Sequence, residues 1–582
     1  MVTAGSGSPE PRRKLRDWFA SVALFAASAA VALWQNAHVA VLWDLSYVLD
    51  SASRIASGQV PYRDFPLVHA PLTFLIQAAT IRFTGRVYFH HVLYVAAVAG
   101  FSAVLAWRIL LRSLFKRMQN DWTIALILSA PLIFLGIYCV FPFPSYDCDC
   151  ACSILVAIYF LQRVSARSSH LQAAVTGAAL CVPLFFKQNI GLPFLAVASA
   201  SILFVLVLAF FRRSDPSTSN PEIARLSVAL AAGVAALATA LLLVHFSFGL
   251  GNYVHWTIQF AAQRRLPGFA DMLGVYRDPS LLWKLPCIAA GLVLLHPRIA
   301  KWTQFLAIAL LSAPFLFTLC SLVVYDDSDE RGDALLALWP LLIILAAALA
   351  LYRLVRHRVS LDLESLLPII VLVAINGTLM SQQLWGSTYA IWPLLILLAA
   401  DLIAFLAPSG AARNFPRAAA PAIAVIFSVT LIVCGAFYTA SEDRLSYVQL
   451  SDGPVQHSAF PQLAGMSTSG PYLPDFDELL RYAQANIPAN DGIVLLPGED
   501  PFYFATGRNP QYPVLLFDPA TEPYSPAQLA HESRKHQIRW LIVKRQLQIN
   551  ADPTPDRAAT LAALLPGFTF AAHLSAYDIY RR

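Results

Sequence analysis

Charged residues are scarce in this sequence. Asp, Glu, Lys and Arg make up 13% of its 582 residues, whereas about 25% is usual for soluble globular proteins. This scarcity excludes an ordinary soluble protein. The chain instead repeats apolar runs of roughly 17 to 25 residues, the length that a helix needs to cross a hydrocarbon core of ~30 Å. Short segments of alternating polarity are absent, which excludes a transmembrane barrel.

Other features are missing as well. The net charge is +6, but no single basic surface stands out, because the Lys and Arg residues cluster in short loops between apolar runs, as is typical of cytoplasmic loops. We therefore expect no nucleic-acid partner. The chain after Cys434 contains no cysteine, so no disulfide framework holds it. The sequence shows neither a glycine-rich phosphate fingerprint nor an internal repeat.

Three cysteines alternate with other residues in the segment 144–152, PSYDCDCAC. Structural zinc sites usually use cysteine pairs that are spaced by two to four residues, so this pattern fits them poorly. We predict that these cysteines are small buried side chains, with metal binding as the alternative. No residue is assigned as a metal ligand.

Hydropathy and basic loops together predict a polytopic α-helical membrane protein with about thirteen transmembrane helices. Basic residues within 12–16 precede the first apolar run, and no small-residue cleavage site follows, so we expect an uncleaved anchor. The segment 71–85 is short, and we expect an interfacial helix there. Nine spans are expected at 18–34, 87–107, 122–140, 171–186, 190–212, 226–250, 305–324, 366–380 and 418–438. Four more run toward the basic loops at Arg163, Arg298, Arg353 and Arg413.

This topology places polar groups from six loops on the extracytoplasmic face, namely Asp44, Asp147, Lys187, Arg264, Asp326 and Gln382. We therefore expect an integral protein of the inner (cytoplasmic) membrane. Its transmembrane domain covers 1–439 and includes a first extracytoplasmic loop at 40–86. Asp401 lies near the cytoplasmic end of an expected span, where this topology offers no explanation for it.

The composition changes after Tyr438, where Pro, Asp, Gln and Gly become frequent and no further spanning run occurs. The length that remains is normal for one domain, and we predict a small extracytoplasmic α/β domain at 440–582. Helices are expected at 475–486, 525–536 and near Ala558, and strands at 492–496, 514–517, 538–543 and 568–579.

The stretch 44–71 carries the polar groups of the first loop. In a helix that leaves the membrane, Asp44, Tyr47 and Ser51 share one face, while Asp50 can pair with Arg54 four residues later. Asp44 has no local cation. Such a carboxylate can act as a general base toward a hydroxyl if burial raises its pKa. The alternative is a solvated aspartate at the interface.

The later residues of the stretch 44–71 include one expected turn and two candidates for substrate binding. Asp64 stands next to Arg63 and is expected to close a turn. Tyr62 and His69 are candidates, together with Tyr47, for binding a substrate beside Asp44.

Two more carboxylates lie in the segment 144–152. Asp147 and Asp149 are two residues apart, and in an extended loop their side chains face opposite ways. We expect only one of them to point into a cavity shared with Asp44. Both are candidates for catalysis.

Cations and amides complete the candidate site. Lys187, and Arg264 with Arg265, can neutralise a departing phosphate, although lipid headgroup binding is the alternative for the two arginines. Gln188 follows Lys187 and is a candidate for substrate binding. Amide and aromatic side chains that could bind a hydroxyl-rich substrate follow at Gln382, Gln383, Trp385 and Tyr389. The alternative is that these residues belong to the belt of aromatic side chains at the membrane interface.

Four motifs together resemble those of a known enzyme class. Asp44 and Tyr47 form D-x-x-Y, and G-x-x-P-Y-R-D-F follows at 58–65. K-Q-N occurs at 187–189, and Q-x-L-W-G-S-x-Y-A-x-W-P-L occurs at 382–394. The set is similar to that of the integral-membrane glycosyltransferases of the GT-C class, in particular the branch that contains the aminoarabinose transferases and the protein mannosyltransferases.

The resemblance implies a polyprenyl-phosphate sugar donor and an inverting transfer at the extracytoplasmic face to a hydroxyl of a glycan, lipid or protein acceptor. It also implies a catalytic carboxylate in the first extracytoplasmic loop, which corresponds to Asp44; our own hypothesis adds Lys187 at the leaving phosphate. Leu45 follows Asp44 where the common pattern has a second acid, so no metal site is transferred, and the need for a divalent cation stays open. Membrane lipids are the other expected partners.

Two other classes of function stay open. A transporter or flippase of lipid-linked sugars would place polar residues near the bilayer midplane in broken helices and would move the lipid without covalent transfer. A non-catalytic subunit for envelope assembly would bind partners through the C-terminal domain and would tolerate the loss of Asp44 together with Lys187.

Overall fold

The structure is a computed structural model that describes residues 11–38, 40–115, 117–118, 120–140, 142–211, 221–263, 273–295, 302–356, 362–379, 389–407, 418–441, 453–518, 522–548 and 557–582. Within these ranges the side chains of residues 11–13 and 389 are not described. Four residues predicted to bind a substrate therefore lie outside the described residues, namely Arg264, Arg265, Gln382 and Gln383.

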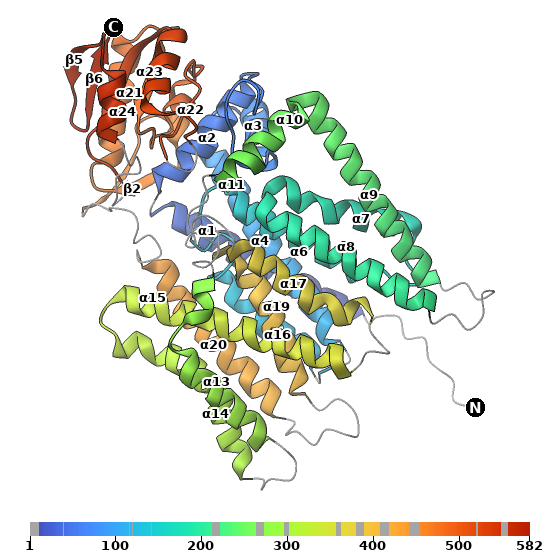
Figure 1. Cartoon of the computed structure of the whole chain (residues 1–582). Coiled ribbons are helices and arrows are strands. Elements are labelled where there is room, and N and C mark those ends of the chain that lie inside the picture. Colours follow the sequence, from blue (N-terminus) through green and yellow to red (C-terminus); the bar gives the residue numbers. More distant parts are fainter. Residues whose placement is uncertain are drawn as a thin grey trace.

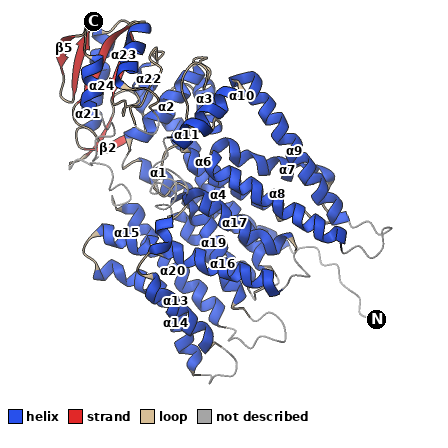
Figure 2. Ribbon diagram, in the orientation of Figure 1, coloured by secondary structure: helices blue, strands red, loops and turns tan. Residues whose placement is uncertain are grey.

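Helices dominate the described chain up to Ser441 (Figures 1 and 2). The long elements are α1 Pro11–Asn36, α2 Leu42–Ala56, α3 Leu72–Thr84, α4 Tyr88–Leu114, α5 Asp121–Ser129, α6 Tyr146–Leu161, α7 His170–Phe186, α8 Gln188–Phe211, α9 Pro221–Phe248, α13 Leu281–Leu294, α14 Thr303–Val324, α15 Ser328–Leu336, α16 Leu338–Arg356, α17 Leu363–Leu379, α19 Trp392–Phe405 and α20 Ala419–Ala440. Short helical pieces are η1 Ala130–Ile133, α10 Leu250–Val254, η2 His255–Phe260, α11 Ala261–Gln263, η3 Leu273–Arg277 and η4 Tyr389–Ile391.

Seven helical segments in the described ranges are long and apolar enough to cross a membrane: α1, α4, α8, α9, α14, α15 with α16, and α20. The other positions where spans were expected also hold helices, α5 with η1, α6, α7, α13, α17 and α19, but these are shorter. The count of thirteen spans therefore stays a prediction. The segment expected at the interface is indeed a helix, α3, and its place in the membrane also stays a prediction.

The C-terminal part contains the strands. Its elements are β1 Val455–His457, η6 Pro461–Leu463, β2 Ser467–Ser469, α21 Tyr472–Asn486, β3 Gly492–Leu496, α22 Phe502–Thr506, α23 Pro526–Lys535, β4 Ile538–Lys544, α24 Arg557–Leu564, β5 Thr569–His573 and β6 Tyr577–Arg581. Four strands form a mixed sheet in the order β3-β4-β6-β5, in which only β3 and β4 are parallel. The strands β1 and β2 form a separate pair.

Two expectations for this part were wrong. The run 514–517 is not a strand, although Val514, Leu516 and Phe517 are buried; Phe517 N donates to Pro497 O at 2.9 Å, but no strand ladder includes the run. Burial explains why the residues of this run are apolar. An apolar run forms a strand only where its backbone joins a strand ladder, so the apolar pattern alone was misleading. The run 568–579 is not one strand either, since β5 and β6 form an antiparallel hairpin.

Helix α2 lies between the C-terminal part and the helix bundle (Figure 1). Twelve of its 15 residues are buried, which is unusual for a helix with this many polar side chains. Leu42, Leu45 and Leu49 pack into the main core, whereas Trp43 and Tyr47 belong to a second cluster. The helix that carries Asp44 is therefore enclosed by two different parts of the molecule.

Candidate active site

Asp44 is the third residue of α2, which begins at Leu42 after the extended residue Val41. Within the described part of the chain, its carboxylate has no hydrogen bond and no ion pair. Burial raises the pKa of Asp44 to about 7, and the negative charges of Asp518 and Asp147 add to the effect while Lys187 opposes it. A carboxylate that exchanges its proton near neutral pH is suited to general base catalysis.

Lys187 and Asp147 form a buried ion pair close to Asp44. The Lys187 Nζ atom donates to Asp147 Oδ1, and both residues are less than 10% exposed. The Nζ atom also lies 4.9 Å from the centroid of the Tyr146 ring. The structure therefore brings together three groups that the sequence analysis placed in three separate loops.

The position of Lys187 follows from a break between two helices. Lys187 is extended, with φ −151° and ψ 115°, and separates α7 from α8. Gly191 permits this tight connection, because a Cβ atom there would lie 2.3 Å from the Leu184 backbone nitrogen. The break turns the Lys187 side chain toward the first turn of α6, where Asp147 is located.

Asp149 has a different environment from Asp147. Its two oxygens accept hydrogen bonds from Thr73 Oγ1 at 2.6 Å, Tyr94 OH at 2.8 Å and Tyr138 OH at 2.7 Å. The two aspartates lie in the first turn of α6 and not in an extended loop, so that expectation was wrong. Residues two apart in a helix still point to different sides, and only Asp147 binds Lys187.

An aromatic wall stands beside this group. The His69 ring stacks on Tyr146 with centroids 4.0 Å apart, and Tyr47 packs edge-on against His69 at 5.6 Å. Burial, together with the charge of Lys187, lowers the pKa of His69 to about 3. His69 is therefore neutral at physiological pH and can offer a hydrogen bond without competing with Lys187 for an anion.

Tyr62 and Gln188 bind backbone groups around the aromatic wall. Tyr62 OH donates to His69 O at 2.7 Å. Gln188 Nε2 donates to Thr257 O at 2.8 Å and to Val68 O at 3.3 Å. Both residues therefore hold the segment that carries His69, and their predicted binding of a substrate stays a prediction. Tyr389 lies in η4, and its side chain is not described.

The predicted ion pair between Asp50 and Arg54 does not form. Asp50 Oδ1 accepts from Phe504 N at 2.7 Å and Oδ2 from Tyr503 N at 3.3 Å. Arg54 Nη1 donates to Pro513 O at 2.9 Å. Both side chains face the C-terminal part, and each forms hydrogen bonds with backbone groups there and not with the other side chain.

Two other aspartates have clear partners. Asp64 closes a turn as expected, because Oδ2 accepts from Val60 N at 2.7 Å and Oδ1 lies 2.9 Å from Arg63 Nε. Asp401, unexplained by the sequence, bridges two arginines: its oxygens lie 2.9 Å from Arg117 Nη2 and 2.6 Å from Arg353 Nη1. This bridge joins the ends of helices that are remote from Asp44.

Sequence reasoning missed Asp518. It follows the buried run 514–517, and its charge acts on Asp44, Tyr47 and Tyr146. No sequence signal could have found it, because 474 positions separate it from Asp44 along the chain. The C-terminal part therefore contributes a charge to the candidate site.

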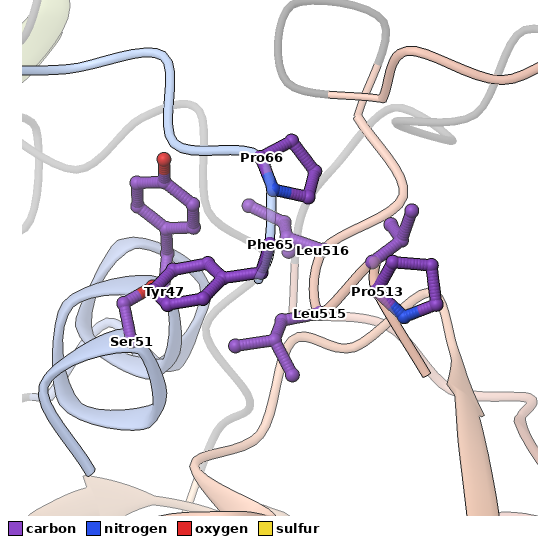
Figure 3. Close-up of a pocket in the computed structure, with 8 residues that line it drawn as sticks. Tyr47, Ser51, Phe65, Pro66, Pro513, Leu515 and Leu516 are labelled. Carbon is purple, nitrogen blue, oxygen red and sulfur yellow. The ribbon is translucent and has the colours of Figure 1, made fainter. Parts of the chain in front are cut away.

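A small pocket marks the contact between α2 and the run 513–516 (Figure 3). Tyr47 and Ser51 line one side, Phe65 and Pro66 a second, and Leu515 and Leu516 a third. Its volume of about 10 Å³ has room for roughly one water molecule. This contact is therefore closed, and a substrate would have to reach Asp44 from another direction.

The described residues contain no group of three or more His, Cys, Asp or Glu side chains that could hold a metal ion. The cysteines of α6 are buried, and Cys148 Sγ donates to Ile137 O at 2.8 Å. They are placed as small buried side chains, as predicted from their spacing.

Comparison with solved structures finds matches over most of the chain. ArnT from Cupriavidus metallidurans bound to undecaprenyl phosphate matches 96% of this chain and 97% of its own length, with a TM-score of 0.46 and 12% identity. The Archaeoglobus fulgidus oligosaccharyltransferase in the apo form matches 90% of this chain and 69% of its own, with a TM-score of 0.46 and 12% identity. No protein-family model and no curated protein sequence matches.

Both matched proteins are GT-C glycosyltransferases, the class that the sequence motifs resemble. The TM-scores are 0.46 and the identities 12%, so no residue role is taken from these proteins. The chemistry is argued from the side chains of this chain.

Proposed function

We propose that this protein is a membrane glycosyltransferase that moves a sugar from a polyprenyl-phosphate donor to an acceptor hydroxyl on a glycan, lipid or protein. The observation that carries the proposal is Asp44, a partly buried carboxylate with no hydrogen-bond or ion-pair partner among the described residues, near a buried lysine, Lys187. Base and cation are the two groups that such a transfer needs. The donor class follows from the resemblance of the motifs around Asp44 and Lys187.

Asp44 acts as the general base. Its carboxylate takes the proton of the acceptor hydroxyl as the oxygen attacks the anomeric carbon of the sugar. The bond between that carbon and the phosphate oxygen breaks, and the electron pair leaves with the phosphate. One displacement at one carbon inverts its configuration. Because Asp44 accepts a proton near neutral pH, it is matched to this step.

Lys187 stabilises the leaving group. Charge accumulates on the phosphate as the bond breaks, and a buried cation stabilises it more strongly than an exposed one. Asp147 holds Lys187 in place before the lipid binds, so the ammonium group is already oriented. Asp149 supports the same helix turn through its three hydroxyl donors.

The proposed location is the inner membrane, with the candidate site and the C-terminal part on the extracytoplasmic side. The distribution of basic loops supports this orientation. In the structure, the bridge of Arg117, Asp401 and Arg353 lies at the opposite ends of the helices. Those ends would face the cytoplasm, where arginines at span ends are enriched.

The test uses the purified protein in proteoliposomes that contain polyprenyl-phosphate-linked sugars and an envelope extract as acceptor. Mass spectrometry should show the loss of the lipid-linked sugar and the gain of polyprenyl phosphate. Asp44→Asn should abolish the conversion, while Asp64→Asn, a matched control in an exposed turn, should leave it intact. Conversion by Asp44→Asn at the wild-type rate, or movement of the sugar lipid across the bilayer without conversion, would contradict the proposal.

A further inference from the structure

Helix α2 is bound to the C-terminal part on every turn of one face. The four residues are spaced by four positions, so they share this face. Leu42 N donates to Gln548 Oε1 at 2.6 Å, and Ser46 Oγ donates to Gly498 O at 3.0 Å. The other two contacts are those of Asp50 with the Phe504 amide and of Arg54 with the Pro513 carbonyl.

Asp44 and Tyr47 lie on the same helix, outside this row of four contacts. Tyr47 meets His69 with ring centroids 5.6 Å apart and also lines the small pocket with Leu515 and Leu516. A helix that is held along its length on one face has little freedom to rotate or slide. The position of Asp44 is therefore set by contacts to residues more than 440 positions away in the sequence.

Gln548 contacts the first residue of α2, two positions before Asp44. The first N–H groups of a helix have no partner within the helix, and the residue before α2, Val41, has no side chain that could cap it. Gln548 supplies the cap from the C-terminal part: Oε1 accepts from Leu42 N, and Nε2 donates to Ala40 O at 2.9 Å. Its side chain is fully buried, with 0% exposure.

Gln548 is itself held by a buried network. Its backbone N–H donates to both oxygens of Glu499, at 3.0 and 3.1 Å. Glu499 and Asp500 both accept from Lys544 Nζ, and Asp500 also accepts from Tyr577 OH at 2.7 Å. Each of these side chains is at most 3% exposed. The cap on α2 is therefore rigid.

We propose that Gln548 is a positioning residue of the active site, which caps α2 from the C-terminal part and so holds the Asp44 carboxylate at the acceptor hydroxyl. The kinetic part of this inference rests on the proposed function of Asp44, and the structural part does not. The C-terminal part is accordingly a component of the catalytic unit and not a separate binding module.

The test compares Gln548→Met, which keeps the size and removes both hydrogen bonds, with the control Gln59→Met. Gln59 binds Pro510 O at 3.1 Å in the same interface, beyond the far end of α2. Hydrogen exchange in proteoliposomes should become about tenfold faster at residues 42–46 in Gln548→Met, because a lost hydrogen bond of roughly 1.4 kcal/mol changes an opening equilibrium tenfold. Gln59→Met should leave exchange at 42–46 unchanged.

The kinetic readout separates positioning from simple destabilisation. In Gln548→Met, kcat should fall about tenfold or more while KM for the lipid-linked sugar changes less than twofold. The acid limb of the kcat profile should move to lower pH. Water that reaches Asp44 would weaken the effect by which burial raises its pKa, while the charges of Asp518, Asp147 and Lys187 would stay the same. Equal losses in Gln59→Met and Gln548→Met would overturn the proposal.

Ser46→Ala is a milder second variant, because it removes one hydroxyl, which is shared between Trp43 O at 2.8 Å and Gly498 O at 3.0 Å, and it leaves the other three contacts of α2 with the C-terminal part in place. In this variant kcat should also fall while KM stays nearly unchanged, but the loss of kcat should be smaller than in Gln548→Met. Unchanged exchange and unchanged kcat in Ser46→Ala, together with a Gln548→Met protein that does not fold, would overturn the positioning role. Full activity of Asp44→Asn would instead refute the proposed function, and faster exchange in Gln548→Met would still support the cap.

Discussion

Two buried lysine and carboxylate clusters lie at the two sides of α2, and they differ in how completely their charges are paired. In the C-terminal part, Lys544 binds Glu499 and Asp500, and these acids also accept from the Gln548 amide and Tyr577. At the candidate site, Lys187 binds Asp147, and the nearby Asp44 has no such partner within the described residues.

This difference distinguishes a cluster that stabilises the fold from a cluster that could take part in a reaction. A cluster whose donors and acceptors are matched is stable and inert, because any proton transfer would break existing hydrogen bonds. A partly buried carboxylate with no partner among the described residues carries a desolvation cost, and Asp44 shows it as a pKa raised to about 7. Such groups are retained mostly at functional sites. Each prediction below changes one of these clusters.

The largest effect is expected for Lys544→Met. It leaves Glu499 and Asp500 buried without their cation, and breaking a buried pair in this way typically costs about 3–5 kcal/mol. Thermal unfolding should show a large loss of stability, and kcat per folded molecule should fall less than in Lys187→Met, because the network that holds the Gln548 cap is loosened while Lys187 stays in place. Lys535→Met, which removes an exposed lysine paired with Glu532, is the control and should be neutral. Comparable stability of the two variants would remove the contrast between the clusters.

Lys187→Met should give the opposite pattern. It removes the cation from the leaving phosphate, and loss of such a stabilising group typically lowers kcat about 10²–10³-fold. Its effect on stability should be smaller than that of Lys544→Met, because one carboxylate loses a partner and not two. Steady-state kinetics and thermal unfolding on the same preparation measure both effects. A stability loss that equals that of Lys544→Met, with normal kcat in the folded fraction, would reverse the assignment.

Some of this arrangement could be predicted from the sequence. The apolar runs and basic loops predicted that Asp44, Asp147 and Lys187 lie on one face, because membrane topology restricts where each loop can lie, and in the structure the three residues interact. The strand β3 was predicted residue for residue, because a short apolar run bounded by Gly492 and Pro497 has few alternatives.

Other parts could not be predicted, and the reason is physical. Asp50 and Arg54 bind backbone groups of the C-terminal part, and backbone groups leave no signature in a sequence. Asp518 reaches the site only through tertiary packing. The run 514–517 is buried without forming a strand, and hydrophobicity alone cannot distinguish a buried loop from a buried strand.

A smaller effect concerns stability and pH. The folded pKa of Asp44 is raised to about 7, above the usual value of about 4, so the folded state binds this proton more tightly. Its contribution to stability is full below pH ~4 and is lost as the pH rises through 7. Asp44→Asn should therefore be as stable as the wild type at pH 4 and more stable at pH 8. Thermal unfolding of both proteins across this range tests it, and a stability difference that does not change with pH would contradict the raised pKa.

The smallest effect is expected for Tyr138→Phe, which removes one of the three hydroxyl donors of Asp149. Thr73 and Tyr94 remain, so kcat should fall by less than about fivefold, the loss of one net hydrogen bond. Transfer assays of Tyr138→Phe and Lys187→Met measure the difference between their losses of kcat. A loss as large as that of Lys187→Met would make Asp149 part of the reacting group and not a support for its helix.

The most direct test of the central claim is a titration of the Asp44 proton itself, which needs no substrate. Infrared difference spectra of the wild type minus Asp44→Asn in proteoliposomes isolate the signal of a protonated carboxyl group. The account predicts that this signal disappears with a midpoint near pH 7 as the pH rises. A midpoint near pH 4, or no protonated carboxyl difference at any pH in this range, would show that Asp44 is an ordinary solvated aspartate and would contradict its role as the base.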